Sequence, residues 1–428
     1  MKTAILGGGI TGLVAAYELS KKKHAVTLFE KEDVLGGMAA GFKEEKWAWF
    51  LERTYHHLFT NDCDILSLAQ KIGYKDIFFS EPKTVSLYGV SNYRTFPVDT
   101  PQDFLSLPFL NLFEKLRAGT ILAFLKISPF LSVYEKQTAK EFLIKTMGEQ
   151  VWGTLWEELF RKKFGNHAKN ILASFIWARI KKRTKKLGYI KGGFQNLVDY
   201  LGEQNIKNGV SILKNINIVS LTQKGDKYEV VQIDQNKKKT STLFDVVVST
   251  LPTPHLLMIA GDIFPKTYTQ QLSTIKYLHA TNLVLITKDP LFKKEYWVNV
   301  CDKNAPMMAL VQHTNFIDKK NYNGDNILYV ANYVEEDDPL FTQPQDWVLS
   351  HHKSYLEKLF GPFFIKKSLL FRTRFAQPLF TKEFIKNKPT FITPLKNFFI
   401  ANLDMTYPYD RGTNYAVKLG REVAGLLL

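Results

Sequence analysis

Cysteine is scarce in this chain, and its scarcity excludes whole classes of protein. The 428 residues include only Cys63 and Cys301, which are too few for a disulfide framework and do not lie at a spacing typical of zinc ligands. The pairs His56–His57 and His351–His352 have no cysteine or carboxylate partners at ligand spacing, and adjacent side chains on a strand point to opposite faces. We therefore predict no bound metal.

Long apolar runs and flexible linkers are also missing. No stretch of about 18 uncharged apolar residues occurs, and the chain begins directly in an apolar strand-like segment. These features predict a cytoplasmic protein, with docking on the cytoplasmic face of a membrane as the alternative. A chain of 428 residues is longer than a single hydrophobic core usually organises. Because no Gly/Ser-rich, Pro-rich or repeated tract divides it, we expect two or three interleaved units.

Arginine is rare among the basic residues, with ten arginines among 57 lysines and arginines. The net charge of +16 is dispersed along the chain, which weakens it as a sign of an anionic partner. Its densest cluster runs from Arg179 to Lys186, near the end of a predicted helix, where cations usually face water. We favour that interpretation over contact with phosphate or a membrane, and we expect no nucleic-acid partner because no binding module accompanies the charge.

What the chain does contain is a glycine-rich turn at its start. An apolar strand predicted over 3–6 leads into the turn, and an apolar helix predicted over 13–19 follows. The first glycine permits a tight turn, the third lets backbone amides approach a diphosphate, and the fourth lets the helix pack closely on the strand. This pattern predicts a dinucleotide site that includes Gly7, Gly9, Ile10, Thr11 and Gly12.

A second strand, predicted over 25–29, ends in an acidic residue at the expected distance from the turn. The carboxylate of Glu30 is placed to accept hydrogen bonds from the hydroxyls of the adenosine ribose. The glycine pair Gly36–Gly37 follows six residues later. It indicates a second close approach of the backbone to an extended cofactor.

At this point the sequence resembles the flavin amine oxidase superfamily, which includes protoporphyrinogen oxidase and the carotenoid desaturases and has UDP-galactopyranose mutase as a relative. The resemblance implies FAD as the cofactor, with the second glycine pair against its diphosphate and ribityl region. Members often carry arginine or lysine where this chain has methionine. The cofactor contacts that it implies here are Lys31, Gly36, Gly37 and Met38.

The resemblance returns in residues 397–428. In the family, a strand here carries an acidic contact to the cofactor, and the last helix points its positive end at the flavin pyrimidine. This chain has Asn402 and Asp404 in place of the family's Gly-Asp or Gly-Glu pair, so we favour Asp404 as the contact, with Asp410 as its rival. In a purely local alternative, Asp410 and Arg411 form an ion pair and Gly412 serves the turn into the helix. No cysteine for a thioether bond occurs in this segment, so we expect the FAD to be non-covalently bound.

A third stretch, 188–197, resembles the family's entry into the central part of the FAD domain, and the apolar run 244–252 is typical of a buried parallel strand. The predicted fold is α/β, with a discontinuous Rossmann-like FAD-binding domain, an α+β substrate domain and a helical subdomain. The predicted FAD-domain segments are 1–80, 188–252 and 395–428. Residues 81–187 are expected to form the helical part of the substrate domain, and 253–394 its mixed or antiparallel sheet.

Substrate-side residues are expected after the second glycine pair. In the mutase-like relatives a histidine-bearing loop at this position passes beside the isoalloxazine. By that resemblance His56 or His57 lies near the flavin, with Arg53 as a further catalytic candidate; the alternative is an ordered polar loop. Further candidates are Tyr277, Trp297 and residues 312–315.

Two apolar features are interpreted first as structure. Trp152, Trp156, Phe160 and Phe164 recur every fourth residue, which predicts a helical stripe that faces the core, with a pocket wall as the alternative. Residues 104–127 predict amphipathic helices that roof the substrate cavity, with a lipid interface as the alternative.

Three functions remain open. We prefer an FAD-dependent oxidoreductase of the amine oxidase or desaturase type, in which flavin N5 accepts a hydride from a carbon beside nitrogen or within an alkyl or polyene chain. The partner is a small-molecule substrate, for which an apolar or aromatic molecule is one option. No second glycine fingerprint for NADPH occurs, so we expect the electrons to pass to oxygen, a quinone or another external acceptor. A mutase-like isomerase acting on a nucleotide sugar is the second function, and its diphosphate needs arginines. The third is a flavin-bearing binding protein without turnover. The arginines available for a diphosphate are Arg53, Arg94, Arg372 and Arg374.

Overall fold

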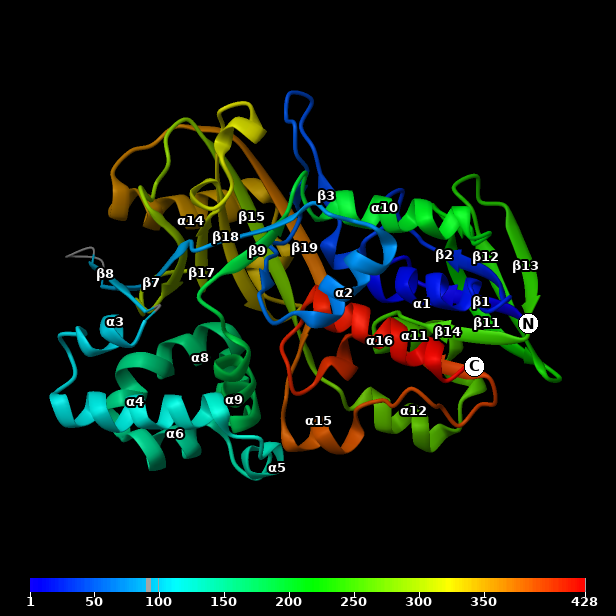
Figure 1. The fold of residues 1–428 in the computed structure, drawn as a ribbon, viewed down its shortest axis with the longest axis horizontal. Helices are drawn as coiled ribbons and strands as arrows, with labels where there is room; N and C mark the ends of the chain where they lie inside the picture. Colours follow the sequence, from blue (N-terminus) through cyan, green and yellow to red (C-terminus); the bar gives the residue numbers. More distant parts are fainter. Residues whose placement is uncertain (90–93, 99, 428) are drawn as a thin grey trace.

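The computed structural model describes residues 1–89, 94–98 and 100–427, and one of its sheets is assembled from three distant parts of the chain (Figure 1). Its five strands are all parallel, and the inner strands are apolar runs that are buried almost throughout. This sheet confirms the predicted α/β fold with a discontinuous Rossmann-like domain. In spatial order the strands are β10 (Ser211–Leu213), β2 (Ala25–Phe29), β1 (Lys2–Leu6), β14 (Val246–Ser249) and β20 (Phe398–Ile400).

Three helices lie side by side against this sheet. The first, α1 (Ile10–Ser20), packs on β1 and β2 and contacts both α10 (Phe194–Lys207) and α16 (Thr413–Gly425). The approach of α16 is close, because a Cβ atom on Gly420 would lie only 2.6 Å from the carbonyl oxygen of Thr11. Glycine at this position therefore lets the last helix pack against the first turn of the first helix.

The second large sheet has seven strands and forms the substrate-side layer. All of its neighbouring strands are antiparallel except β16 and β7, which are parallel. Helix α14 (Gln345–Phe360) packs on this sheet and carries His351 and His352, so this pair does not lie on a strand as we assumed. The strand order is β19 (Ile365–Pro378), β15 (Tyr277–Thr287), β18 (Asn326–Val334), β17 (Ala309–Gln312), β16 (Glu295–Val300), β7 (Lys83–Tyr88) and β8 (Arg94–Pro97).

A helical layer lies beside this sheet, at the lower left of Figure 1. Its helices are α3 (Pro101–Leu105), α4 (Leu112–Ile127), α5 (Leu131–Tyr134), α6 (Ala139–Met147), α7 (Glu149–Val151), α8 (Glu157–Phe164) and α9 (Ala173–Lys182), with a π-helical turn over Trp152–Trp156. Smaller sheets complete the fold: β3 (Gly41–Phe42) with β4 (Leu51–Glu52); β5 (Leu58–Phe59) and β6 (Ile77–Ser80) with β9 (Leu187–Ile190); and β11 (Asn217–Lys224), β12 (Lys227–Ile233) and β13 (Lys239–Phe244). The remaining helices are α2 (Cys63–Ile72), α11 (Thr253–Ala260), α12 (Lys266–Ser273), α13 (Pro339–Thr342) and α15 (Lys382–Asn387).

Helices α4 and α5 and the turn between them carry large apolar side chains that face solvent. Phe113 is 71% exposed, Ile127 76% and Phe130 60%. No residue of 104–127 lines the cavity described below, so the expectation that these helices roof the substrate cavity is wrong. Contact with a lipid interface stays a prediction. Within the described parts of the chain, no helix has the length and apolarity needed to cross a membrane.

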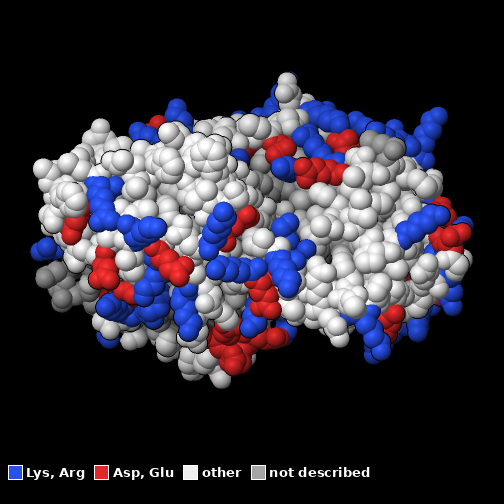
Figure 2. Space-filling view, turned by 90° about the horizontal axis from the view of Figure 1, so that it is seen from below, with Lys and Arg blue, Asp and Glu red and all other residues white. Residues whose placement is uncertain are grey.

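Basic side chains are spread over the surface. Seen from below, lysine and arginine form separate groups with wide uncharged areas between them (Figure 2). Several of them pair with acids, as in Lys71 with Glu18 and Lys367 with Glu44, both at 2.7 Å. The net charge of the whole chain therefore does not by itself mark a binding surface.

Candidate active site

The turn between β1 and α1 lies at the carboxyl end of the parallel sheet, beside the end of β2. Its backbone is held by Glu30, whose Oε2 accepts a hydrogen bond from the Gly8 N–H at 2.8 Å. Gly7 has a φ of +106°, a conformation that favours glycine. A Cβ atom on Gly12 would lie 2.0 Å from the Gly7 carbonyl oxygen, so the turn and the helix can approach this closely only with glycine there.

The same turn leaves room for an anion. No side chain caps the N-terminus of α1, so its first amides keep their affinity for a negatively charged ligand. A Cβ atom on Gly9 would meet no protein atom closer than 3.9 Å, which leaves the space in front of the helix open. The Gly36 N–H donates to the Gly8 carbonyl oxygen at 2.9 Å, and the second glycine pair thus lies directly against the first turn. These residues fit the diphosphate and ribose of a dinucleotide.

A cavity of about 270 Å³ is lined by the substrate-side sheet, by α8 and α9 of the helical layer, and by the start of α16. Residues 412–414, at the uncapped N-terminus of α16, line it. Arg411 also lines it, and its guanidinium contacts the sulfur of Met38 at 3.7 Å. Because Met38 directly follows the second glycine pair, this contact joins the glycine-rich turns to the cavity.

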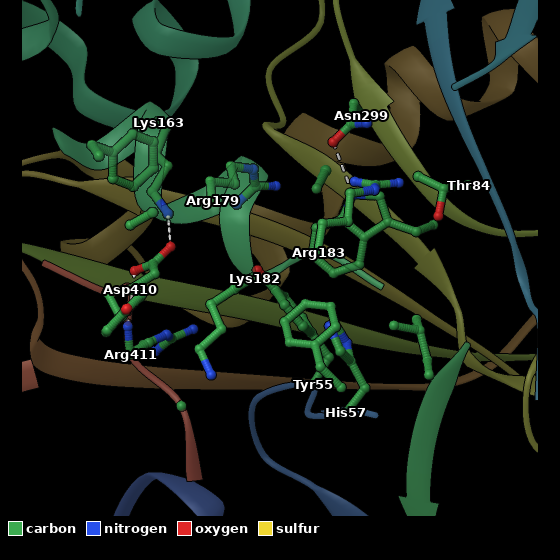
Figure 3. Close-up of a pocket in the computed structure, with 18 of the residues that line it drawn as sticks. Tyr55, His57, Thr84, Lys163, Arg179, Lys182, Arg183, Asn299, Asp410 and Arg411 are labelled. Carbon is green, nitrogen blue, oxygen red and sulfur yellow. Dashed lines mark hydrogen bonds and ion pairs between the residues drawn. The ribbon is translucent and has the colours of Figure 1, made fainter. Parts of the chain in front are cut away.

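An acid paired with a lysine stands among further cations in the cavity wall. Lys163 Nζ lies 2.6 Å from a carboxylate oxygen of Asp410, with Arg179 and Arg411 nearby (Figure 3). Burial alone would raise the pKa of Asp410, but these three cations hold that pKa below its usual value. Burial lowers the pKa of Lys163 to about 8, although Asp410 opposes this change. The acid is therefore ionised and the pair is formed at neutral pH.

The two candidate histidines both line this cavity. Burial, together with the charge of Arg411, lowers the pKa of His56 to about 4. Burial, together with His56 and the arginines of α9 and the following loop, lowers the pKa of His57 to about 3. His56 Nδ1 lies 2.5 Å from the Thr54 carbonyl oxygen, which can only accept, so Nδ1 carries the proton. Both rings are neutral at pH 7.

Other predicted residues lie away from the cavity. Asp404 is buried, and its carboxylate accepts hydrogen bonds from Thr253 at 2.5 Å and from Tyr277 at 2.7 Å; burial raises its pKa to about 6. Arg53 does not line the cavity, although its backbone N–H donates to the Ala40 carbonyl oxygen. The roles of Asp404 as a cofactor contact and of Arg53 in catalysis stay predictions. Lys31 is exposed at the end of β2.

Of the further substrate-side candidates, one lines the cavity and another is buried elsewhere. Trp297 lines the cavity, where its ring contacts Tyr55 edge-on at 4.9 Å. His313 is buried in the core and shares a hydrogen bond with the Tyr322 hydroxyl at 2.8 Å. The arginines expected to bind a diphosphate do not line this cavity. They are Arg53, Arg94, Arg372 and Arg374.

The basic cluster at the end of α9 does line the cavity, so the expectation that it only faces water is wrong. Arg179 and Lys182 are three residues apart and occupy one helix face, and both point into the cavity in Figure 3. The sequence pattern along α9 could have indicated that these cations line the cavity. Within α9 the lining residues are 175, 176, 178, 179 and 182, so an apolar helix stripe becomes cationic toward its end.

The aromatic stripe is partly core and partly cavity wall. Trp152 is buried away from the cavity, whereas Trp156, Phe160 and Phe164 line it. The π-helical turn over Trp152–Trp156 breaks the regular spacing and rotates the first ring off the face of the others. The predicted core position is confirmed for Trp152, Phe160 and Phe164, which belong to the buried core. The alternative, a pocket wall, also holds for Trp156, Phe160 and Phe164.

Comparisons with known proteins agree with this architecture. The family model for flavin containing amine oxidoreductases matches residues 10–428. L-amino-acid oxidase from Mus musculus is 25% identical over 326 residues, which cover 69% of this chain and 49% of that protein; the chain thus spans about half the length of this curated relative. Among solved structures, wild-type putrescine oxidase bound to putrescine has a TM-score of 0.73 at 14% identity, covering 100% of this chain and 98% of that one. Reduced UDP-galactopyranose mutase has a TM-score of 0.75 at 13% identity, covering 100% and 93%. These two structures share the fold of this chain. The match of the family model to nearly the whole length of the chain shows that it belongs to the flavin containing amine oxidoreductase family.

Proposed function

We propose that this protein is an FAD-dependent oxidoreductase of the amine oxidase or desaturase type, with FAD bound non-covalently. Bound FAD supplies a hydride acceptor at its N5 atom, and the electrons then pass to oxygen, a quinone or another external acceptor. Membership of a flavin-containing family supports the cofactor class. The glycine turn, Glu30 and the second glycine pair are the residues that would hold the dinucleotide.

One observation carries the proposal: the dinucleotide turns and the cavity meet at the contact between Met38 and Arg411. A cofactor held at the first site would therefore reach the second. The uncapped N-terminus of α16 also lines the cavity. Together with Arg411 it would stabilise negative charge that develops there.

The other cavity residues suit hydride transfer better than acid–base chemistry. His56 and His57 are neutral at pH 7 and cannot act as cationic acids. Trp156, Phe160 and Trp297 offer apolar surface that would exclude water and hold a substrate carbon in position. The ion pair of Lys163 with Asp410 would fix the cavity wall beside Arg411.

The test begins with the flavin itself. We expect purified protein to be yellow and to release FAD, and not FMN, on mild acid denaturation, as judged by chromatography. Anaerobic reduction followed by mixing with air then separates the functions. Reoxidation within seconds indicates an oxidase, whereas slow reoxidation indicates another acceptor or a non-redox use of reduced flavin. Protein that stays colourless after incubation with FAD would refute the proposal.

A second candidate, a mutase-like isomerase acting on a nucleotide sugar, is favoured by the cations in the cavity. The arginines that we expected to bind a diphosphate lie elsewhere, but Arg179, Arg183 and Arg411 line the cavity instead. Guanidinium groups bind phosphates in a bidentate manner. Tight binding of UDP-galactose to the reduced form, with no net change in flavin oxidation state on turnover, would favour this candidate over the oxidoreductase.

A further inference from the structure

The charged residues around the cavity are unequal in number. Among the residues that the structure describes, six lysines and arginines line it, against two acids, Asp62 and Asp410. One of the six, Lys185, is paired with Glu81 at 2.7 Å. Asp410 lies 2.6 Å from Lys163 and also interacts with Arg179 and Arg411. The carboxylate of Asp62 accepts a hydrogen bond from the Phe59 N–H at 2.8 Å and also interacts with Lys182. Two acids offset only part of the positive charge of the wall.

Three of the other cations in the cavity wall come from two separate parts of the chain. Arg179 and Lys182 come from the last turn of α9, and Arg411 comes from the segment before α16 (Figure 3). Lys182 lies over the rings of Tyr409 and Tyr415, 5.5 Å from each centroid, and Arg411 lies over Tyr333 at 5.3 Å. The rings hold these cations in place without neutralising their charge.

The cavity also has apolar wall residues. Trp156, Phe160 and Trp297 line the same cavity, and none of them offers an acid to a positively charged ligand. Putrescine, the ligand of the structurally similar putrescine oxidase, is a dication at neutral pH. Its ammonium groups would meet like charges here, and like-charge juxtaposition selects against a ligand.

We propose that the substrate of this protein is an anion, in which a carboxylate or phosphate group binds at the cationic wall that Arg179, Lys182 and Arg411 form and an apolar or aromatic body lies against Trp156, Phe160 and Trp297. The inference rests on the proposed function, since it names the substrate class of that cavity. It separates this chain from oxidases of free polyamines. It also gives a role to the basic cluster at the end of α9.

The test uses three probes with one ring system and different head groups: 2-naphthoate, 2-naphthyl phosphate and 2-naphthylmethylammonium. Binding to the flavin-loaded protein is measured by calorimetry and by quenching of tryptophan fluorescence, since two tryptophans line the cavity. We expect one or both anions to bind and the ammonium not to bind over the same concentration range. Tighter binding of the phosphate than of the carboxylate would identify the oxyanion as a phosphate, and the reverse would identify a carboxylate.

Variants then locate the anion. Arg179→Gln and Lys182→Gln should each weaken binding of the better anion by about ten- to a hundredfold, as expected for a lost hydrogen bond to a charged group. The matched control is Lys186→Gln, which removes the same charge from the same cluster at an exposed residue that does not line the cavity. It should change the affinity by less than about twofold, because exposed charges are screened by salt.

Two results would overturn the inference. In the first, the ammonium probe binds the wild-type protein as tightly as the anions do, a comparison that needs no variant. In the second, Lys186→Gln weakens binding of the anion as much as Arg179→Gln does. That result would indicate non-specific electrostatic attraction by the whole basic cluster and no defined anion site. Arg179→Lys, which keeps the charge but loses the guanidinium fork, covers the case in which Arg179→Gln does not fold. A yellow protein without anion binding refutes this inference alone, whereas a protein that binds no flavin refutes the proposed function.

Discussion

A buried carboxyl group should make this protein less stable as the pH rises. Glu52, at the end of β4, is fully buried; it accepts hydrogen bonds from the Tyr189 hydroxyl at 2.6 Å and from the Phe194 N–H at 2.7 Å. Burial raises its pKa from 4.5 to about 7, although both hydrogen bonds act in the opposite direction. The perturbation that isolates its contribution is Glu52→Gln, which keeps the shape and cannot ionise.

The direction of this pH dependence follows from the number of protons that the folded and unfolded states bind. Between pH 4.5 and pH 7 the folded protein keeps a proton on Glu52 that the unfolded chain releases, so the free energy of unfolding falls as the pH rises. The stabilisation is complete below pH 4.5 and is lost as the pH rises through 7. At about 1.4 kcal/mol for each pH unit, the full loss is about 3 kcal/mol, of which about 2.5 kcal/mol falls between pH 5 and pH 8.

The assay is urea unfolding at pH 5 and at pH 8, followed by circular dichroism and tryptophan fluorescence and analysed as two-state only where the two signals coincide. The wild type should lose about 2.5 kcal/mol more between the two pH values than Glu52→Gln does. Glu357→Gln, which removes a surface carboxylate from α14, is the matched control. Parallel pH dependences in the wild type and Glu52→Gln would refute the reasoning, whatever the absolute stabilities.

Three further predictions concern the cofactor site and the surface. Gly12→Ala should abolish flavin retention, because its Cβ atom would lie 2.0 Å from a backbone oxygen; the flavin content of the purified protein measures this. Glu30→Ala should weaken FAD binding by about 3 kcal/mol, roughly a hundredfold, through the loss of two charge-assisted hydrogen bonds, as measured by fluorescence titration of the apoprotein. Phe113→Ser combined with Ile127→Ser should reduce co-sedimentation with anionic lipid vesicles, because both side chains are more than two thirds exposed.

Each of these has its own control. Gly119→Ala places the same methyl group in α4, where it meets no atom within 4 Å, and it should leave the flavin content unchanged. Unchanged FAD affinity in Glu30→Ala would show that the ribose does not bind to Glu30. If the wild-type protein does not co-sediment with vesicles at all, the expected membrane contact is refuted.

Local signals could be recognised in the sequence directly, and the family resemblance indicated which distant segments form the parallel sheet, but the side chains that meet in the cavity could not be predicted. The predicted strand over 3–6 and helix over 13–19 correspond to β1 and α1, because the glycines between them impose the turn by local sterics. The cavity depends on residues brought together across the chain, and Arg179 meets Asp410 and Arg411 only through the packing of α9 against the last segment. The π-helical turn at Trp152–Trp156 could not be predicted either, because aromatic residues at every fourth position fit an ordinary α-helix equally well.

The parallel sheet also fixes when the molecule can be completed during synthesis. Strand β1 is made first, yet its partner β14 begins at residue 246, and β20, which pairs with β14, begins at 398. At about 5–20 residues per second, on the order of 20–80 seconds separate the first strand from the last. Throughout the first part of that interval one edge of β1 has no strand beside it, and an open edge can pair with other chains. A ribosome that stops before residue 246 would therefore release an aggregation-prone fragment, and not a smaller version of the cofactor domain.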